Sequence, residues 1–322
     1  MAPEPPEVKV TGQRRIRLGD GELQIRPIEN RDVLGLAALY DGLDPDDRYR
    51  RFFSAYHPSS AFFERLATVA ERNGVGLVAV WVLGGGSTEE IVADAEYEML
   101  PNGDGELAIT VAASWRGWLG PWLLDALLDT AGARGVPNLE ADVLATNGPM
   151  LALARARGCV SLDREDWSVV RVLIGATGRT PTWPRGGRQP RLLIEGIGGG
   201  WRADHAVRRA GLRVIACPGP AARRMRCPAM AGRPCPLAAD ANLIVVCLPP
   251  DAEKRDELLA AHSILHPGVT VCVDSGGPDP RPGVTVLPRN KPEVVGVVRA
   301  LARRGSPGAS AGGAQDAHQR KE

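Results

Sequence analysis

A short loop rich in glycine and tryptophan joins an apolar strand to a helix within residues 106–135. The first turn of a helix carries backbone N–H groups without intrahelical partners, and the helix dipole makes that end partly positive. Such a junction is suited to bind the oxygens of a pyrophosphate. Pro121 fits the first helical position but has no N–H to offer. The remaining candidates for this site are Arg116, Gly117, Trp118, Leu119, Gly120 and Trp122.

The elements that must position this loop follow a pattern typical of a mixed α+β domain. The turn at 101–105 (PNGDG) predicts an antiparallel hairpin between the strands before and after it. Apolar patterns predict strands at 23–27, 76–83, 91–100, 106–112, 139–145 and 168–174. Helical periodicity, with Asp44 as one cap, predicts helices at 30–43, 45–54, 59–70, 121–133 and 148–157.

Two segments resemble the GNAT superfamily of acyl-CoA-dependent N-acyltransferases. They are ELAITVAASWRGWLGPWLLDALLDTAGARG at 106–135 and LEADVLATNGPMLALARARGCV at 139–160, in the order and at the distance expected. GDGELQIRPIENRDVLGLAAL, followed by DDRYRRFF, resembles the bacterial protein-lysine acetyltransferases of that superfamily. The resemblance implies a GNAT fold, with a mixed and largely antiparallel sheet, over residues 1–178. It also implies acetyl-CoA as acyl donor and an amine acceptor, either a protein lysine or a small molecule.

The same resemblance assigns roles to particular residues. The pantetheine arm of CoA is expected to hydrogen-bond like an added strand along Ile109, Thr110 and Val111, where two strands splay apart. Asn147 is expected to contact CoA or the acceptor, and it can equally cap the helix that follows. The chain departs from the family pattern in two places. Its pyrophosphate loop is one residue short, and Ala154 stands where many relatives carry a tyrosine that protonates the departing thiolate.

Glu106 matches the glutamate that acts as general base in the protein-lysine acetyltransferases. A protonated amine cannot attack a thioester, so the chemistry requires a group that removes a proton. Glu106 could equally be a solvated residue at the end of a hairpin. Asp94, Glu96 and Glu98 share one face of the neighbouring strand and could supply the base or attract a cationic substrate. A polar outer face would explain these three equally well.

Residues 179–190 are rich in glycine, proline and arginine and predict a linker to a second domain at 191–304. Strands at 191–195, 213–217, 242–248, 269–274 and 284–287 alternate with helices, which predicts a parallel, doubly wound α/β sheet. The segment GVTVLPRNKPEVVGVVRALARR resembles the end of response-regulator receiver domains. Cys247 stands in the place of the phosphoacceptor aspartate, and only Glu195 remains of the acidic pair that would hold magnesium. A receiver-like or flavodoxin-like domain without phosphotransfer, acting as a regulatory module, is therefore expected.

Cysteine and histidine spacing does not predict a metal centre. The six cysteines are irregularly spaced and include no Cys-x-x-Cys pair of the kind that zinc sites usually show. We expect them to be free thiols. His205, His262 and His266 accompany no matching carboxylate or nucleophile pattern in the sequence, which predicts surface residues.

Composition narrows the possible partners. The 39 Lys+Arg nearly balance the 38 Asp+Glu, and this leaves no general attraction to nucleic acid. The absence of a long apolar run and of a signal-like N-terminus predicts a cytoplasmic protein without a membrane partner. Residues 305–322 lack core-forming side chains and are expected to be disordered. The alternative to an active N-acetyltransferase is a catalytically silent acyl-CoA sensor that signals through the second domain.

Overall fold

A computed structural model describes most of the 322-residue chain. The described residues are 13–83, 88–163, 168–176, 179–196, 201–220, 227–249, 254–274, 284–288 and 290–304. The expected disordered tail at 305–322 lies outside them. Contacts divide the chain into two units, Met1–Gly186 and Gly187–Glu322, with the boundary inside the expected linker.

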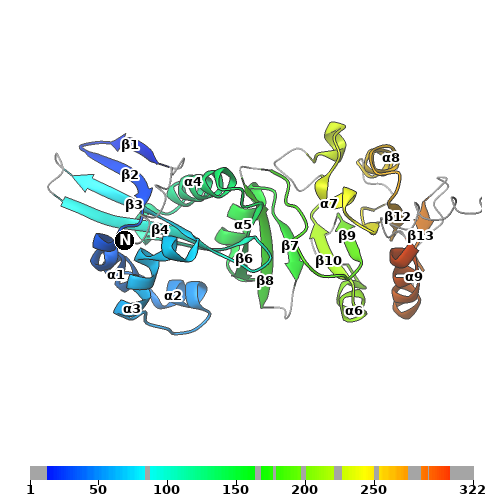
Figure 1. The fold of residues 1–322 in the computed structure, drawn as a ribbon, viewed down its shortest axis with the longest axis horizontal. Helices are drawn as coiled ribbons and strands as arrows, with labels where there is room; N and C mark the ends of the chain where they lie inside the picture. The colour runs from blue at the N-terminus through cyan, green and yellow to red at the C-terminus, as the bar shows by residue number, and fades with distance from the viewer. Residues whose placement is uncertain are drawn as a thin grey trace, which may run out of the picture. The chain divides into compact units, whose positions relative to one another are not determined.

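The first unit is built on a mixed sheet whose strands run mostly antiparallel (Figure 1). The strand order is β1-β2-β3-β4-β5-β6-β8-β7, and among these described strands β5 with β6 is the only parallel pair. This arrangement confirms the expected hairpin of β4 with β5. The strands are β1 (Arg14–Leu18), β2 (Gly21–Pro27), β3 (Val75–Leu83), β4 (Thr88–Met99), β5 (Gly105–Val111), β6 (Asn138–Leu144), β7 (Val160–Asp163) and β8 (Val169–Gly175).

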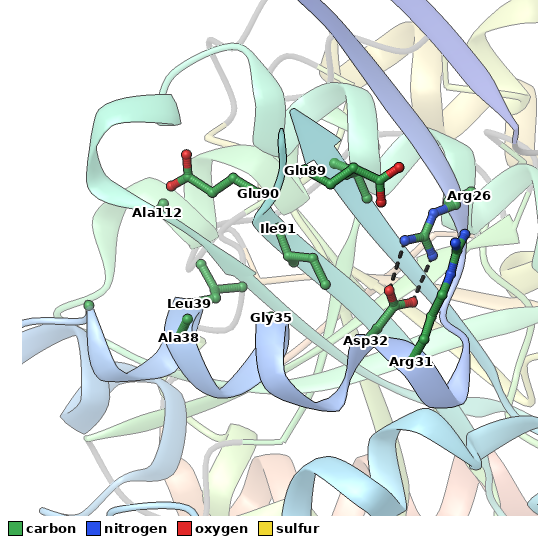
Figure 2. A pocket seen from close by; sticks show the side chains of 12 residues that line it. Arg26, Arg31, Asp32, Gly35, Ala38, Leu39, Glu89, Glu90, Ile91 and Ala112 are labelled. Carbon is green, nitrogen blue, oxygen red and sulfur yellow. Dashed lines mark hydrogen bonds and ion pairs between the residues drawn. The ribbon is translucent and has the colours of Figure 1, made fainter. Parts of the chain in front are cut away.

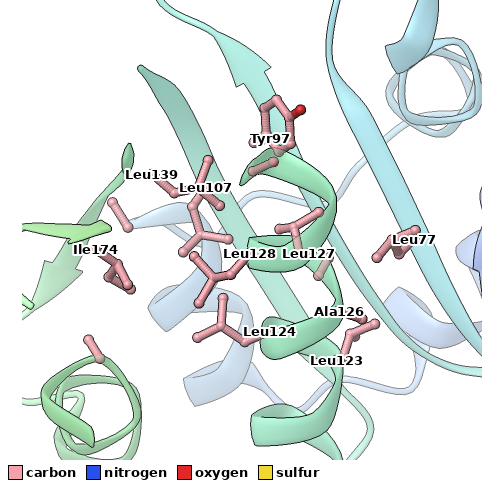
Figure 3. Packing of buried hydrophobic residues seen from close by; sticks show 14 of the residues in the cluster. Leu77, Tyr97, Leu107, Leu123, Leu124, Ala126, Leu127, Leu128, Leu139 and Ile174 are labelled. Atoms are coloured by element: carbon pink, nitrogen blue, oxygen red, sulfur yellow. The ribbon is translucent and has the colours of Figure 1, made fainter. Parts of the chain in front are cut away.

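Helices cover both faces of this sheet, because its strands alternate apolar side chains between two sides. Val78 and Val80 of β3 face a cluster formed with α1 (Val33–Asp41), α2 (Pro45–Phe52) and α3 (Ser60–Ala67). Leu77, one residue away, faces the long helix α4 (Leu119–Ala133) on the opposite side. Figure 3 shows side chains of α4 packed among those of the strands, including Leu107 and Leu139.

Three local features differ from the sequence prediction. Strand β1 was not expected, because its sequence RRIRL is largely charged and its middle residues are exposed. Strand β7 has only four residues, too few to show a period. Helix α4 begins at Leu119, two residues before the expected start, so Pro121 occupies its third position. Helix α5 (Gly148–Ala156) matches its expected range within a residue.

The expected linker is partly packed. Trp183 is only 4% exposed, and the backbone N–H of Thr182 donates to Asn138 Oδ1 over 2.9 Å. Asn138 also donates through Nδ2 to Asp104, 2.8 Å away. Since Asn138 is itself fully buried in β6, residues 181–184 are fastened to the first unit by a buried polar network.

The second unit contains a five-stranded parallel sheet, as expected. Its order, β10-β9-β11-β12-β13, is the 2-1-3-4-5 order of flavodoxin-like doubly wound sheets. The strands are β9 (Arg191–Glu195), β10 (Arg213–Cys217), β11 (Leu243–Val246), β12 (Thr270–Val273) and β13 (Thr285–Val286). The helices are α6 (Asp204–Arg209), α7 (Pro236–Ala239), α8 (Arg255–Leu265) and α9 (Lys291–Arg304). Kinship with receiver domains stays a prediction.

The prediction that His262 and His266 are surface residues was wrong. They lie four residues apart on the buried side of α8, with 0% and 4% exposure. His262 Nε2 lies 2.7 Å from Glu195 Oε2, and the two Nδ1 atoms of the histidines are 3.1 Å apart. The buried carboxylate of Glu195 at the end of β9 supplies the partner that the sequence pattern did not reveal. His205 is exposed, as expected.

Candidate functional site

Strands β5 and β6 begin as neighbours and then separate. Their pairing consists of Gly105 with Leu139 and Glu106 with Glu140, and it ends there. The other edge of β5 stays paired with β4 as far as Val111, and β6 stays paired with β8 along its whole length. A gap therefore opens within the sheet from Leu107 onward. The edges of β5 and β6 that border this gap have no partner strand among the described residues.

The three strand residues predicted to hold an extended ligand lie in this gap region. Ile109, Thr110 and Val111 all fall in the part of β5 beyond its last pair with β6. The hydroxyl of Thr110 turns to the α1 side, where it donates to Tyr40 Oη over 3.0 Å. Beyond Glu106 no described strand pairs with the β6-facing edge of β5, although Arg116 donates to the carbonyl of Val111 at its end.

The gap opens toward the N-terminus of α4. Trp118 is the N-cap residue, so Leu119 and Gly120 carry first-turn N–H groups. The N–H of Trp122, also expected as a donor, instead donates to Trp118 O at 3.3 Å. The group of free N–H donors at the start of α4 is thus smaller than the sequence predicted, because the helix starts two residues earlier.

The loop before α4 is held by a turn and an ion pair. Gly117 has a φ of +97°, a backbone conformation that residues other than glycine rarely adopt. Arg116 binds Asp47 of α2 and also donates to Val111 O over 3.4 Å. Its guanidinium therefore fixes the loop to α2 and to the end of β5. With that partner, Arg116 acts here as a brace for the loop.

Tryptophans line the outside of the same loop, a feature that the sequence prediction did not use. Successive ring centroids of Trp81, Trp115, Trp118 and Trp122 are separated by 5.2, 6.2 and 6.1 Å. These contacts fix the loop against β3 and stiffen the entry to α4.

Two of the acidic residues on the α1 side of β4 are internal. Asp94 is fully buried and accepts a hydrogen bond from Tyr40 Oη at 3.3 Å. Burial raises the pKa of Asp94 well above its ordinary value, and the neighbouring Glu96 adds to the effect. Glu96 is held by Arg51, whose Nη2 lies 2.6 Å from Oε1. Neither carboxyl is placed to meet a substrate from solution.

Glu98 and Glu106 are directly opposite each other in the β4–β5 pair, on that same face. Glu98 binds Arg65 at 2.8 Å and Arg72 at 2.9 Å. The hydrogen bond from Arg72, with that from Arg65, lowers the pKa of Glu98 against the effect of its burial. Glu106 is exposed and, among the described residues, has no cation beside it. Glu106 thus lies at the closed end of the gap, which is the end where β5 and β6 are still paired.

Glu140 was missed by the sequence prediction. It is the β6 residue paired with Glu106 at the last rung before the gap, and it is half-buried. The strand 139–145 was expected, but which of its residues would stand beside Glu106 depends on the register of two strands far apart in sequence. No local signal carries that register.

Asn147, which follows β6, is the N-cap residue of helix α5. Asn147 Oδ1 accepts the N–H of Met150 at 3.2 Å, so the capping role of Asn147 is observed. Its predicted contact with CoA or the acceptor stays a prediction. Ala154 is fully buried in α5 and offers no proton donor.

A separate pocket of about 370 Å³ lies between α1 and the start of β4 (Figure 2). Arg26 donates twice to Asp32 at 2.7 and 2.8 Å on one wall, while Glu89 and Glu90 line another. The pocket reaches Ala112, just past the end of β5. It therefore lies at the opposite end of β5 from Glu106.

The described residues contain no group of three or more His, Cys, Asp or Glu side chains arranged to hold a metal ion. No helix among them combines the length and apolar character needed to cross a membrane.

No protein-family model matches the chain, and no curated protein matches it. Among solved structures, the chain is similar to the GNAT domain of S. lividans PAT, with 25% identity and a TM-score of 0.45 over 51% of this chain and 97% of that one. An acetyltransferase of the GNAT family from Streptococcus pneumoniae shows 20% identity and a TM-score of 0.38, covering 47% and 96%. Spermidine N-acetyltransferase from Vibrio cholerae, in complex with CoA and spermine, shows 16% identity and a TM-score of 0.39, covering 48% and 96%.

Proposed function

We propose that the first unit is an N-acetyltransferase that moves acetyl from acetyl-CoA to an amine by direct attack. The observation that carries the proposal is the gap between β5 and β6, which opens toward the N-terminus of α4. One end of the gap offers helix N–H groups and the other offers an exposed carboxylate. A donor with an anionic end, an extended amide-containing arm and a reactive thioester fits this order of features.

The pyrophosphate of CoA would lie at the first turn of α4. Leu119 and Gly120 supply N–H groups there, and the helix dipole favours the negative charge. The amides of the pantetheine arm would pair with the open edge of β5 along Ile109, Thr110 and Val111. Since the arm hydrogen-bonds as a strand does, the protein can hold it without a dedicated set of side chains.

Glu106 would take the proton from the incoming ammonium group. Once Glu106 has passed that proton to water, the freed amine nitrogen attacks the thioester carbonyl. The C–N bond forms, the nitrogen gives its second proton to Glu106, and the C–S bond breaks with its electron pair on sulfur. An exposed carboxylate without a bound cation is suited to this role, because it meets both solvent and substrate. The acceptor class is an amine, either a protein lysine or a small-molecule amine.

A silent acyl-CoA sensor is the second candidate, and specific observations favour it. Pro121 and Trp122 contribute no free N–H to the anion site, and Ala154 cannot protonate a thiolate. Under this candidate the receiver-like second unit would carry the response to acyl-CoA as a regulatory module.

Binding and turnover separate the two candidates. We expect acetyl-CoA and CoA to raise the unfolding temperature, by an amount that grows with ligand concentration. Free thiol should then appear from acetyl-CoA in the presence of lysine-containing peptides or polyamines. Stabilisation without thiol release would support the sensor. The absence of any stabilisation would contradict both candidates.

A further inference from the structure

Glu140 lies at the point where the proposed reaction takes place. It is in register with Glu106 across the parallel β5–β6 pair, so the two carboxyl groups project from the same face of the sheet. Their pair is the last one before the gap opens. The inference drawn below rests on the proposed function of this gap.

The length of the gap indicates that the thioester of the proposed donor would lie beside Glu106 and Glu140. Beyond the Glu106 pair, β5 continues from Leu107 to Val111, a span of about 17 Å at the usual strand rise. The donor's pyrophosphate end lies at α4, beyond Val111. Its extended arm therefore runs back along β5, and the thioester comes to lie near the closed end, beside Glu106 and Glu140.

Thioester cleavage releases a thiolate, which is expelled more readily if a nearby acid protonates it. Ala154 cannot supply that proton. The other acids on this face are committed, since Asp94 is fully buried and Arg51 holds Glu96. Glu98 binds two arginines. Glu106 is already assigned as the base. Among the described residues of β4, β5 and β6 on this face, Glu140 is therefore the remaining acid at the closed end of the gap.

The surroundings of Glu140 favour its protonated form. Burial raises the pKa of Glu140, and the negative charges of Asp104, Asp142 and Glu106 act in the same direction. Arg171 opposes them, but its guanidinium binds Asp142 at 2.8 Å. Two adjacent carboxyl groups in different environments are a common way to divide acid and base roles.

We infer that Glu140 is the general acid of the proposed reaction, and that it gives its proton to the departing CoA sulfur while Glu106 accepts the proton of the amine. The C–S bond breaks with its electron pair on sulfur, which takes the proton from Glu140 to form the free thiol. Glu106 then releases its proton to water, and Glu140 regains one from water. The products are one amide and one thiol.

The test compares donors that differ in the acidity of the leaving thiol. Glu140→Gln should lower kcat/KM for acetyl-CoA roughly 100-fold or more. With S-acetyl thiophenol, whose aryl thiolate leaves without help, the same variant should lie within a few-fold of wild type. Glu106→Gln should be impaired with both donors. Glu90→Gln, an exposed strand glutamate at the far end of the sheet, is the matched control.

Each outcome has a distinct meaning. If Glu140→Gln turns over acetyl-CoA at the wild-type rate, or loses both donors equally, the acid role is wrong. Glu140→Asp retains a carboxyl group and should recover part of the acetyl-CoA rate, so it decides the matter should Glu140→Gln fold poorly. Wild-type protein that releases no thiol from any donor would instead overturn the proposed function itself.

Discussion

Glu106 differs from the other carboxylates of its sheet face in what surrounds it. Glu96 and Glu98 are neutralised by arginines, and Asp94 is enclosed between Tyr40 and Glu96. These contacts explain why the three acids of β4, which the sequence left open as alternative bases, are better suited to hold α1, α2 and α3 on the sheet. Glu106 is exposed, and no cation lies beside it among the described residues.

Replacing Glu106 by glutamine should therefore affect chemistry and leave donor binding alone. We expect kcat to fall by roughly 100-fold, because the amide has the shape of the carboxylate but cannot accept the amine proton. The Kd for acetyl-CoA, measured by calorimetry, should stay within about two-fold. An unchanged rate at neutral pH would assign the base to another group.

The buried chain of Glu195, His262 and His266 has a fixed hydrogen-bond direction. His266 Nε2 accepts the backbone N–H of Cys235 at 3.0 Å, so in the neutral ring Nδ1 carries the proton. That proton faces His262 Nδ1, and His262 therefore donates from Nε2 to Glu195. The ring of His266 is therefore satisfied as a neutral group, and a second proton on it would have no acceptor.

Stability of the second unit should consequently fall in mild acid. Burial and the neighbouring His262 lower the pKa of His266 below its ordinary value of 6.5. Between that value and the lowered one, the unfolded chain binds a proton that the folded chain excludes, so stability is lost as pH falls from about 6.5. Hydrogen exchange of the β9 and β11 amides should accelerate between pH 7 and pH 5. The acceleration should be smaller in His266→Gln, and a flat profile in wild type would contradict the assignment.

At the scale of elements, the strands with a clear period were predictable within a few residues. The hairpin of β4 and β5 also followed from local turn chemistry. Strand β1 was hidden by its arginines, and the start of α4 was displaced because proline tolerates the third helical position as well as the first. Glu140 and the histidine pair of α8 were missed for one reason. Their partners come from strand register and helix packing, which join residues distant in sequence.

The first turn of α4 offers a prediction with its own control. A Cβ placed on Gly120 would lie 3.9 Å from Leu153 Cδ2 and Val111 Cγ2, an ordinary contact. Gly120→Ala should therefore leave the fold and CoA affinity nearly unchanged. Gly120→Glu should abolish binding, because its carboxylate would compete with the pyrophosphate at the same N–H groups. Equal Kd values of the two variants for CoA, measured by calorimetry, would show that the first turn of α4 does not bind the pyrophosphate.

At the scale of the whole molecule, the end of the first unit lies later than composition suggested. A glycine- and proline-rich sequence predicted a free linker from 179, but composition cannot show that Thr182 binds Asn138 or that Trp183 is buried. The division of contacts places the end at Gly186.

A chain ending at Gly186 should fold alone and bind acetyl-CoA as the full protein does. A chain ending at Gly178 should be less stable by about several kcal/mol, because it removes the Thr182 N–H that donates to buried Asn138 Oδ1 and also removes a buried tryptophan. Urea unfolding of the two fragments measures the difference. Equal midpoints would show that residues 179–186 contribute nothing to the first unit.

The gap between β5 and β6 also makes the unliganded sheet one strand short in its middle. Open strand edges usually occur at the rim of a sheet, where charged side chains or a covering loop prevent pairing with strands of other chains. Here two such edges face each other, and a single extended backbone could satisfy both. The slot would accept any slender chain with amides at strand spacing, so in the absence of donor it is the place where a peptide segment would insert. CoA bound in this slot as proposed would also protect the protein against insertion of a peptide strand, and preparations stripped of CoA should aggregate sooner than those supplied with it.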